Sequence, residues 1–444
     1  MKKIILTALA VASCCVINAQ SGTNSPYSQY GLGVLSDEGV SFNRGMNGAG
    51  VAFSEHDRIN TVNPASYASI DSLSFLFDVG MSLQRTFFKE GSNSVQANNA
   101  DFEYAVGAFR LIPKVGMSFG IRPFTNVGYN YGNASYNELE SFKPVNEDDK
   151  YYTTNTFTGS GGIHQVFVGM GWNPVSTLSV GFNMAYLWGN TTRTVVNSYS
   201  DASVNTLTKT YTNSVSSYKL DLGLQYSYPV TKHDVVTLGV VYGVGHDLNN
   251  YPELSIVSTN SSNSVADTTQ LSSDHKLALP TTLSVGVGYR HDTRWRAGID
   301  YSLEKWSDIY SARQVSDPTT GKYSYKSTRG DYMNRSKFTI AGEYCQNEFS
   351  RSFLSRIRYR AGISYATPYY KVNGADGPDE FSATIGFAIP IMNAYNSSAT
   401  NFSNVNVSAQ WVRTSMSNAI KENTFRINIG LTFNERWFAK WKFN

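Results

Sequence analysis

The residues with the greatest capacity for chemistry are six histidines and three cysteines, spread over 444 residues. No two histidines have a metal-ligand spacing such as His-x-x-x-His, and the cysteines do not form a paired site of the kind that binds zinc. A phosphate-binding loop of the Walker type is also absent from the sequence. We therefore expect no enzymatic activity, no metal and no cofactor.

Composition excludes two classes of protein. The 37 Lys and Arg residues against 34 Asp and Glu give a formal net charge of +3, which is unlike a strongly basic nucleic-acid binder. Beyond residue 20, no apolar run approaches the roughly 20 residues of a membrane-spanning helix. Yet only 16% of the residues are charged, and Tyr, Phe and Trp make up 14%. A large soluble all-β protein and a transmembrane β-barrel remain.

The elements that must position side chains are segments in which apolar and polar residues alternate, the pattern of a β-strand with one apolar face. Their even number and their length are typical of barrel strands. The sequence therefore predicts an all-β fold, a transmembrane antiparallel β-barrel of about fourteen strands over residues 72–433. The segments are residues 73–83, 102–108, 115–121, 166–172, 178–188, 218–228, 236–242, 283–289, 295–303, 338–344, 357–365, 381–389, 405–411 and 425–433.

Charged residues within these segments lie on the parity opposite to the apolar series. Only Arg110, just after the second segment, would continue an apolar series. A Lys or Arg that faces lipid at mid-bilayer costs roughly 2–4 kcal/mol, so this partition favours a lipid-facing outer surface. We expect the inward charges to form ion pairs that hold a plug or the strand register; without a plug they would line a polar channel. The candidate luminal charges are Lys219, Asp221, Arg296, Asp300, Arg358 and Arg360.

The connections between segments alternate in length. Pro113-Lys114 and Asn173-Pro174 are short, whereas the stretch from about Arg122 to Gln165 is long and rich in Ser, Thr and Asn. Short periplasmic turns and long extracellular loops are the arrangement of outer-membrane barrels, which predicts the bacterial outer membrane with both chain ends on the periplasmic side. The stretches 194–196 and 206–211 are predicted to extend two strands beyond the membrane as a hairpin.

The two ends of the chain have distinct compositions. Residues 1–19 have a positive start, an apolar stretch and a small-residue cleavage region, which predicts a cleaved signal peptide. Val11-Ala12-Ser13-Cys14 is an alternative, lipoprotein-type cleavage site that would leave a lipidated Cys14. Residues 434–444 are predicted to form a periplasmic C-terminal tail, either a contact for a partner or an interfacial anchor.

Residues 20–71 precede the first strand and are too long for an ordinary leader. They contain turn-forming glycines, among them Gly45, Gly48 and Gly50, and the inward parity of the barrel is rich in small residues. A fourteen-stranded barrel is too wide for its own side chains to fill. We therefore expect residues 20–71 to fold into the lumen as a plug; a periplasmic arm is the alternative.

The stretch from Arg44 to Ala52, followed by Asn63-Pro64-Ala65 and then the first strand, resembles the FadL/OmpP1/TodX family of outer-membrane transporters. The resemblance implies a luminal hatch that carries Asn63, Pro64 and Ala65. It also implies uptake of hydrophobic compounds such as long-chain fatty acids, which leave sideways into the membrane through a kink in the third strand. That strand contains Gly116, Ser118 and Gly120 and ends near Pro123, so these residues are the candidate lateral opening.

The same family includes non-transporting, PorV-like barrels. The resemblance therefore leaves a second function open, that of a partner or scaffold barrel in an outer-membrane secretion or assembly complex, and an unplugged barrel would be a porin-like pore. The expected partners are outer-membrane lipid, and either hydrophobic small molecules or other subunits of an outer-membrane complex. We expect no nucleic-acid partner.

Overall fold

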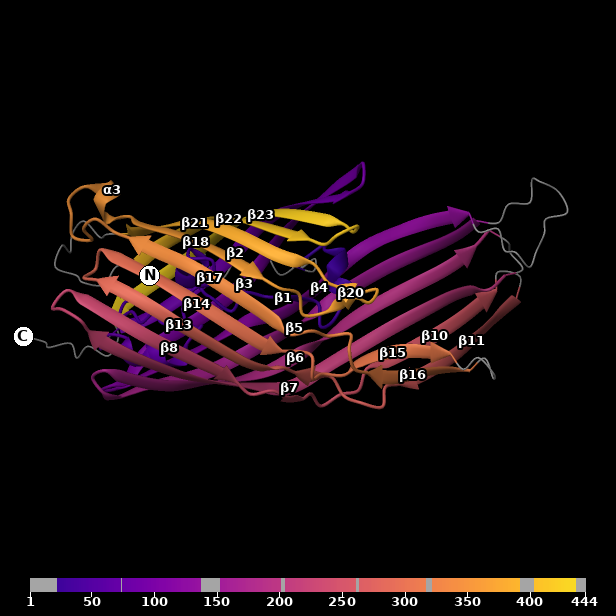
Figure 1. Cartoon of the computed structure of the whole chain (residues 1–444), viewed down its shortest axis with the longest axis horizontal. Helices are drawn as coiled ribbons and strands as arrows, with labels where there is room; N and C mark the ends of the chain where they lie inside the picture. Colours follow the sequence, from indigo (N-terminus) through magenta and orange to yellow (C-terminus); the bar gives the residue numbers. More distant parts are fainter. Residues whose placement is uncertain are drawn as a thin grey trace, which may run out of the picture.

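A closed barrel of fourteen antiparallel strands dominates the computed structural model, which describes residues 22–72, 74–136, 152–200, 204–260, 263–316, 322–391 and 403–436 (Figure 1). Each strand pairs with the next, and the first pairs with the last from Ser74 opposite Arg436 to Lys89 opposite Lys421. Every predicted segment overlaps one of these strands, so the predicted fold is confirmed. They are β2 (Ser74–Glu90), β3 (Asn93–Ile112), β4 (Val115–Tyr136), β5 (Tyr152–Val175), β6 (Leu178–Tyr199), β7 (Thr206–Pro229), β8 (Asp234–Gly243), β13 (Thr281–His291), β14 (Trp295–Lys305), β17 (Arg335–Tyr344), β18 (Arg358–Ala366), β21 (Asp379–Ile391), β22 (Ser403–Ser415) and β23 (Lys421–Arg436).

Alternation places apolar side chains outside and charged ones inside. Leu83, Ile299 and Ile385 are exposed on the outer surface, whereas Asp78 and Arg296 are buried on the inner one. A bilayer is the solvent that such an apolar belt requires.

The predicted inward and outward faces of β3 are wrong over part of the strand. We expected Phe102, Tyr104, Val106 and Ala108 all to face lipid, but only Phe102 does, and the other three are buried inside the barrel. A bulge accounts for this difference, because the register against β2 shifts between Gly80 and Met81, where Tyr104 and Phe102 are their partners. A bulge inserts one residue into one strand and therefore reverses the faces beyond it.

The same bulge explains the apparent exception at Arg110. Arg110 is paired with Gly116, and a side chain added at Gly116 would meet Tyr67 in the lumen, so both residues lie on the inner face. The reversed parity of β3 therefore carries Arg110 inward rather than toward lipid.

Several connections predicted as loops are strand. β2 and β3 run on to a short turn at Gly91, and β4 to β7 are 22 to 24 residues long, against 11 in β13 and β14. The hairpin predicted beyond the membrane is confirmed, since Val195 is opposite Lys209. β10 (Glu253–Asn260) continues the wall beside β7, and β11 (Asn263–Ser272) pairs with β10. One side of the barrel is consequently much taller than the other (Figure 1).

Several parts of the chain lie outside the fourteen barrel strands. The tail begins later than expected, because β23 continues to Arg436; residues 437–444, Leu73 and residues 1–21, with the predicted cleavage sites and Cys14, lie outside the described residues. None of the helices described is both long and apolar enough to cross a membrane. The smaller elements are β9 (His246–Asp247), β12 (Ala278–Leu279), β15 (Ser311–Ser316), β16 (Tyr323–Thr328), α3 (Phe353–Arg356), β19 (Lys371–Val372) and β20 (Ala375–Asp376).

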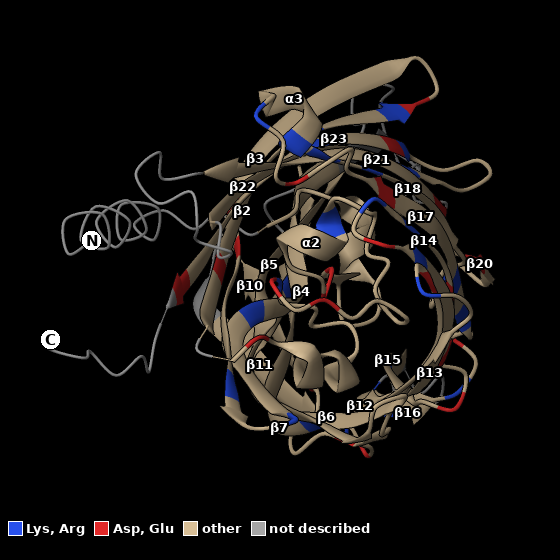
Figure 2. Ribbon diagram, turned by 90° about the vertical axis from the view of Figure 1, so that its left-hand side faces the viewer, with Lys and Arg blue, Asp and Glu red and all other residues tan. Residues whose placement is uncertain are grey.

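Residues 22–72, here called the N-terminal segment, contact the inward side of several strands. Figure 2 shows α2 of this segment within the ring of strands when the barrel is viewed along its length. The segment contains little regular structure: η2 (Pro26–Gln29), β1 (Val34–Leu35), α2 (Ser41–Arg44) and η3 (Pro64–Ser69). Such short elements cannot bury an apolar face alone. Their stability must therefore come from contacts with the barrel wall.

Candidate functional site

The candidate site is the lumen, where the N-terminal segment meets the inward face of the barrel. Asn63 begins η3: its side-chain oxygen accepts a hydrogen bond from the Ala65 N–H at 3.0 Å, and Pro64 occupies the first turn. The Asn63 amide nitrogen also donates to the carbonyl of Val51 at 2.7 Å. One side chain thus starts the helix and holds it to the preceding turn.

Replacing Asn63 separates these two roles. We expect Asn63→Ala to destabilise the folded barrel by about 1–2 kcal/mol, because it removes a helix cap and one of the two hydrogen bonds that the Val51 carbonyl accepts. Asn63→Asp keeps the capping oxygen but turns the donor into an acceptor that faces the Val51 carbonyl. Urea unfolding of the lipid-reconstituted protein measures both, and recovery of stability in Asn63→Asp would show that the cap alone matters.

Inward glycines of the wall give the N-terminal segment its space. A Cβ at Gly116 would lie 1.8 Å from the Tyr67 carbonyl oxygen, and one at Gly181 2.5 Å from that of Pro64. Gly239 and Gly362 stand equally close to Val51 and Met46 of the segment. Backbone packs against backbone here, so the wall and the segment are shaped to each other.

Substituting one of these glycines should disturb the packing. We expect Gly116→Ala to destabilise the protein by about 1–3 kcal/mol, because its Cβ overlaps a backbone atom that no side-chain movement can clear. Gly342→Ala is the matched control, since the Cβ there meets one atom, the Arg296 carbonyl oxygen, at 3.1 Å. Hydrogen exchange of residues 64–70 should rise in the first variant alone; equal exchange would contradict the tight fit.

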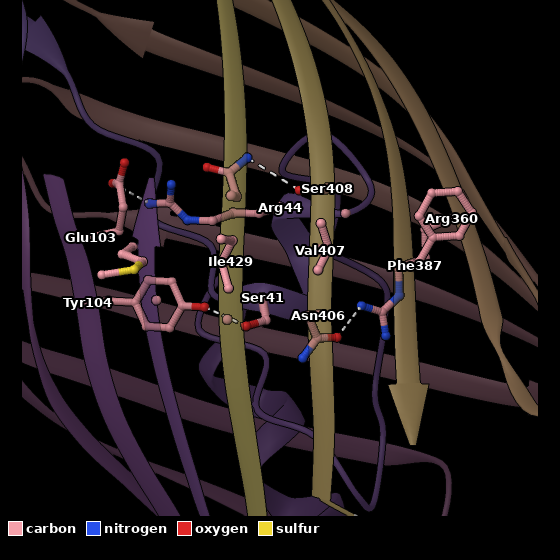
Figure 3. A pocket seen from close by; sticks show the side chains of 15 residues that line it. Ser41, Arg44, Glu103, Tyr104, Arg360, Phe387, Asn406, Val407, Ser408 and Ile429 are labelled. Carbon is pink, nitrogen blue, oxygen red and sulfur yellow. Dashed lines mark hydrogen bonds and ion pairs between the residues drawn. The ribbon is translucent and has the colours of Figure 1, made fainter. Parts of the chain in front are cut away.

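The buried carboxylate of Asp78 attaches the helix α2 to β2, β3 and β23. Figure 3 shows two of the hydroxyl groups that contact it, those of Ser41 and Tyr104. The Ser41 hydroxyl donates to Asp78 at 2.7 Å and lies 2.5 Å from the Tyr104 hydroxyl, while Thr432 donates to the other oxygen of Asp78 at 2.9 Å. Three hydroxyl groups thus surround a carboxylate in place of a cation, as a buried polar group requires.

A second attachment surrounds Glu343 of β17, whose side chain is fully buried. Arg296 and Arg360 lie 2.7 Å from its oxygens, Arg58 lies 3.0 Å away and Arg358 3.3 Å away. Arg58 belongs to the N-terminal segment and the other three to the wall. Three further carboxylates balance the four arginines, and they are Glu55, Asp57 and Glu348.

The remaining candidate charges also lie against the N-terminal segment. Lys219 is 3.0 Å from Glu38 and 2.5 Å from Asp221. Asp300 accepts hydrogen bonds from the N–H groups of Gly50 and Val51 at 2.8 and 3.0 Å. Burial alone would raise the pKa of Glu38, but Lys219 and Arg122 lower it to about 2. Glu38 therefore stays ionised across the physiological range.

The other plug glycines occupy distinct places. Gly45 ends α2, where a Cβ would press on the Arg360 side chain at 2.8 Å, and Gly48 follows with a φ of 87°. That angle lies in the left-handed region that favours glycine.

A cavity of about 390 Å³ remains between the N-terminal segment and the outer mouth. Its wall contains nine carboxylate side chains and four cationic ones, among them Asp101, Glu304, Glu422, Lys337 and Arg426. Apolar side chains share this lining, among them Leu35, Phe124 and Trp306, so the cavity is mixed in character rather than mainly apolar like a typical site for a hydrophobic ligand.

A cluster of apolar side chains from three loops and the N-terminal segment forms one part of the wall of this cavity. Trp306, Tyr369, Tyr370 and Leu277 pack together with Tyr27 of the N-terminal segment. Trp306 and Tyr369 have ring centroids 4.5 Å apart. We call this group the mouth cluster. Its side chains fill one another's space, and sequence reasoning missed it because loop residues show no period.

The wall is interrupted between β3 and β4. Their ladder runs from Ile112 opposite Val115 to Ala105 opposite Ile121, and β3 then follows β2 while β4 follows β5. Ile121 is exposed among the outward apolar residues, so the interruption begins within the apolar belt. Pro123 lies just past it, at a register shift against β5. We call this interruption the β3–β4 seam.

The candidate opening residues below the seam belong to the closed part of the wall. Gly116, Ser118 and Gly120 are paired with β3, and the Ser118 hydroxyl donates to the Gly107 carbonyl at 3.1 Å. These three residues spell Gly-x-Ser-x-Gly, the letters of a hydrolase nucleophile motif, which requires a serine on a strand-to-helix turn. Here the serine lies fully buried within a strand, so the stretch lacks that geometry.

The part of the chain that the structure describes contains no group of three or more His, Cys, Asp or Glu side chains able to hold a metal ion.

The residues that sequence reasoning missed are charges of the N-terminal segment, Glu38, Arg44, Glu55, Asp57 and Arg58. Charges within a segment that is expected to lie inside a barrel were the available signal, because buried charges must be paired.

Solved structures share this fold at low sequence identity. The CymD monoaromatic hydrocarbon channel has a TM-score of 0.58 with 14% identity, over 92% of this chain and all of that one. The toluene transporter TbuX of Ralstonia pickettii gives 0.57 with 14% identity over 89% and 98%, and a FadL homologue of Pseudomonas aeruginosa gives 0.55 with 12% over 90% and 99%. At such identities the likeness concerns the fold alone.

Sequence comparison defines the family. No curated protein matches the chain. The family model described as BamG matches residues 1–444. The expected likeness to FadL and TodX thus holds for the fold, while the sequence places the protein in a different family of barrels. The chain belongs to the BamG family.

Proposed function

We propose that this protein is a non-transporting partner barrel of an outer-membrane complex in Gram-negative bacteria, with a lumen that its own N-terminal segment fills permanently. The observation that carries the proposal is the contact of segment backbone with wall glycines, as at Gly116 and Gly181. A hatch that moves must leave such contacts and regain them at each cycle. Packing this close favours a permanent core.

Two further features support a partner role. The lining of the cavity mixes nine carboxylates and four cationic side chains with its apolar ones, whereas a hydrophobic cargo favours a lining that is mainly apolar. The tall wall of β5, β6 and β7 with β10 offers a wide surface outside the membrane (Figure 1). Surfaces on rigid sheets are well suited to hold another protein in a fixed orientation.

Purification from native membranes tests the proposal. An affinity-tagged chain, extracted in mild detergent, should elute with at least one other outer-membrane protein in fixed stoichiometry. The matched control is a tagged barrel of similar size and abundance carried through the same steps. Elution of this chain as a monomer without a stoichiometric companion, under conditions that preserve known complexes of that membrane, would contradict the proposal.

Transport of hydrophobic compounds is the second candidate, and the β3–β4 seam is the observation that favours it, because a wall interrupted in the apolar belt could release an apolar molecule sideways. Proteins of the same fold include a monoaromatic hydrocarbon channel and toluene transporters. Uptake of fatty acids and monoaromatic compounds by a deletion strain distinguishes the candidates. Reduced uptake that the intact gene restores supports transport, and normal uptake across the panel removes it.

A further inference from the structure

The cavity of about 390 Å³ has more negative than positive charge in its lining. Four of its nine carboxylates form ion pairs, as do two of its four cationic side chains. Among the described residues, five carboxylates and two cations of the lining therefore have no ion-pair partner, and three negative charges remain uncompensated. The five carboxylates are Asp37, Asp101, Asp300, Glu380 and Glu422, and the two cations are Lys337 and Arg426. A confined surface of one sign concentrates ions of the other sign.

Glu422 of β23 is the carboxylate best placed to hold a ligand. It lines the cavity although the residue is only 5% exposed. The Ser25 hydroxyl donates to its Oε1 at 2.7 Å, whereas its Oε2 has no hydrogen-bond partner among the described residues and remains accessible from the cavity. Because a carboxylate this deeply buried requires compensation, the free oxygen is a site for a cationic donor.

Aromatic side chains of the mouth cluster lie beside this carboxylate. Tyr27, Tyr369, Tyr370 and Trp306 all line the cavity. The Tyr370 hydroxyl has no hydrogen-bond partner in the described part of the chain, although the residue is only 8% exposed. Burial raises the pKa of this hydroxyl, and the neighbouring Tyr369 and Glu422 raise it further, so it stays neutral. A neutral hydroxyl can accept a hydrogen bond from an ammonium group, and aromatic rings attract cations.

We propose that this cavity binds a linear di- or triamine, with one ammonium group held between the Glu422 carboxylate and the Tyr370 hydroxyl. The remaining ammonium groups lie toward the other unpaired carboxylates, and the methylene stems pack on apolar residues such as Leu35 and Phe124. A lining that mixes carboxylates with apolar side chains matches an ion of this kind. The volume is also within the range of small-molecule sites, about 300–1,000 Å³.

A metal ion fits the cavity less well than an organic cation. The described residues hold no group of three or more His, Cys, Asp or Glu side chains that could surround a metal. A metal would also gain nothing from the apolar part of the lining. The N-terminal segment, which supplies Ser25 and Tyr27, helps to build the site, so the filled lumen and the ligand are compatible.

Calorimetric titration of the purified full-length protein in detergent micelles tests the proposal, with spermidine as the probe. At about 0.1 M salt, which screens exposed charges, we expect saturable binding with a Kd below about 1 mM. Hexanoate and hexanol, an anion and a neutral molecule with similar apolar stems, should not bind at the same concentrations. Three results would overturn the proposal: no saturable binding of spermidine, equally tight binding of hexanoate, or equally tight binding of Mg²⁺.

A matched pair of variants tests the role of Glu422. Glu422→Gln keeps an oxygen that can accept from Ser25 but removes the charge, so the Kd for spermidine should rise at least about tenfold. The control is Glu435→Gln, at the opposite end of the same strand, where the side chain is exposed and lies outside the cavity. Its Kd should stay within about twofold of the unsubstituted value. Heat-modifiable mobility confirms that both variants are folded, and an equal loss of affinity in the two would contradict the assignment.

Tyr370→Phe tests the hydrogen bond separately from the aromatic ring. Spermidine should bind this variant several-fold more weakly, because the ring remains and only the hydroxyl is lost. Hexamethonium, whose quaternary nitrogens carry no N–H, should bind the variant and the unsubstituted protein alike. An equal change for both probes would show that the hydroxyl does not contact the ligand. These substitutions lie inside the lumen and leave the outer surface intact, so this proposal and the partner role can fail independently.

Discussion

Deleting Ser21 to Ala68 should raise the single-channel conductance of the protein in planar bilayers by at least about tenfold, because a fourteen-stranded barrel is wider than its own side chains can fill. The deletion removes η2, β1, α2 and most of η3, the elements that lie within the ring of strands. What remains is a lumen lined by glycines and by charged side chains. Such a lumen admits water and ions.

The deletion also removes contacts that stabilise the wall, so folding must be measured alongside conductance. The heat-modifiable mobility of a closed barrel serves as that check, and Gly342→Ala, whose Cβ contacts no residue of the N-terminal segment, is the matched comparison. A folded deletion variant with the low conductance of the intact protein would show that residues 21–68 do not close the barrel.

Glu343→Gln should lower the free energy of unfolding by about 3–5 kcal/mol, because removing one partner of a buried ion pair leaves an uncompensated charge in the interior. In this variant Arg58, Arg296, Arg358 and Arg360 lose the carboxylate that all four contact. Urea unfolding in lipid vesicles measures the loss. The N-terminal segment should detach at lower urea than the wall does, since Arg58 is the one of the four arginines around Glu343 that belongs to the segment.

Asp331→Asn is the control for charge removal. Asp331 pairs with Arg313, whose side chain is 58% exposed, and exposed pairs contribute about 1 kcal/mol or less. An equal loss of stability in the two variants would indicate a general effect of charge on barrel folding. It would contradict a specific role for the cluster around Glu343.

Much of the barrel was predictable because strands alternate with a period of two. The parity of charged residues placed Lys219, Arg296 and Asp300 inside before any contact was known. The prediction failed at Tyr104, because a single inserted residue reverses every face beyond it and leaves no mark in the composition.

The sequence pattern did not predict the full length of β4 to β7, for a different reason. Outside the bilayer both faces of a strand meet water, so Ser, Thr and Asn occupy both parities and the apolar period disappears. The contacts between residues in the lumen were harder still to predict. Glu343 was expected to face inward, but its partner Arg58 lies in a segment with little regular structure, and no period relates the two residues. Only the fold brings them together.

Hydrogen bonds between the N-terminal segment and residues at the start of the last strand also constrain how this protein folds. Ser25 bonds to Glu422, and the Tyr27 hydroxyl to the carbonyl of Ile420, residues separated by 397 and 393 positions in the chain. Contacts between such distant residues form late, because almost the whole chain must be ordered before they are gained. The segment synthesised first must therefore wait inside an unfinished sheet until the last strand arrives, and the barrel closes around it.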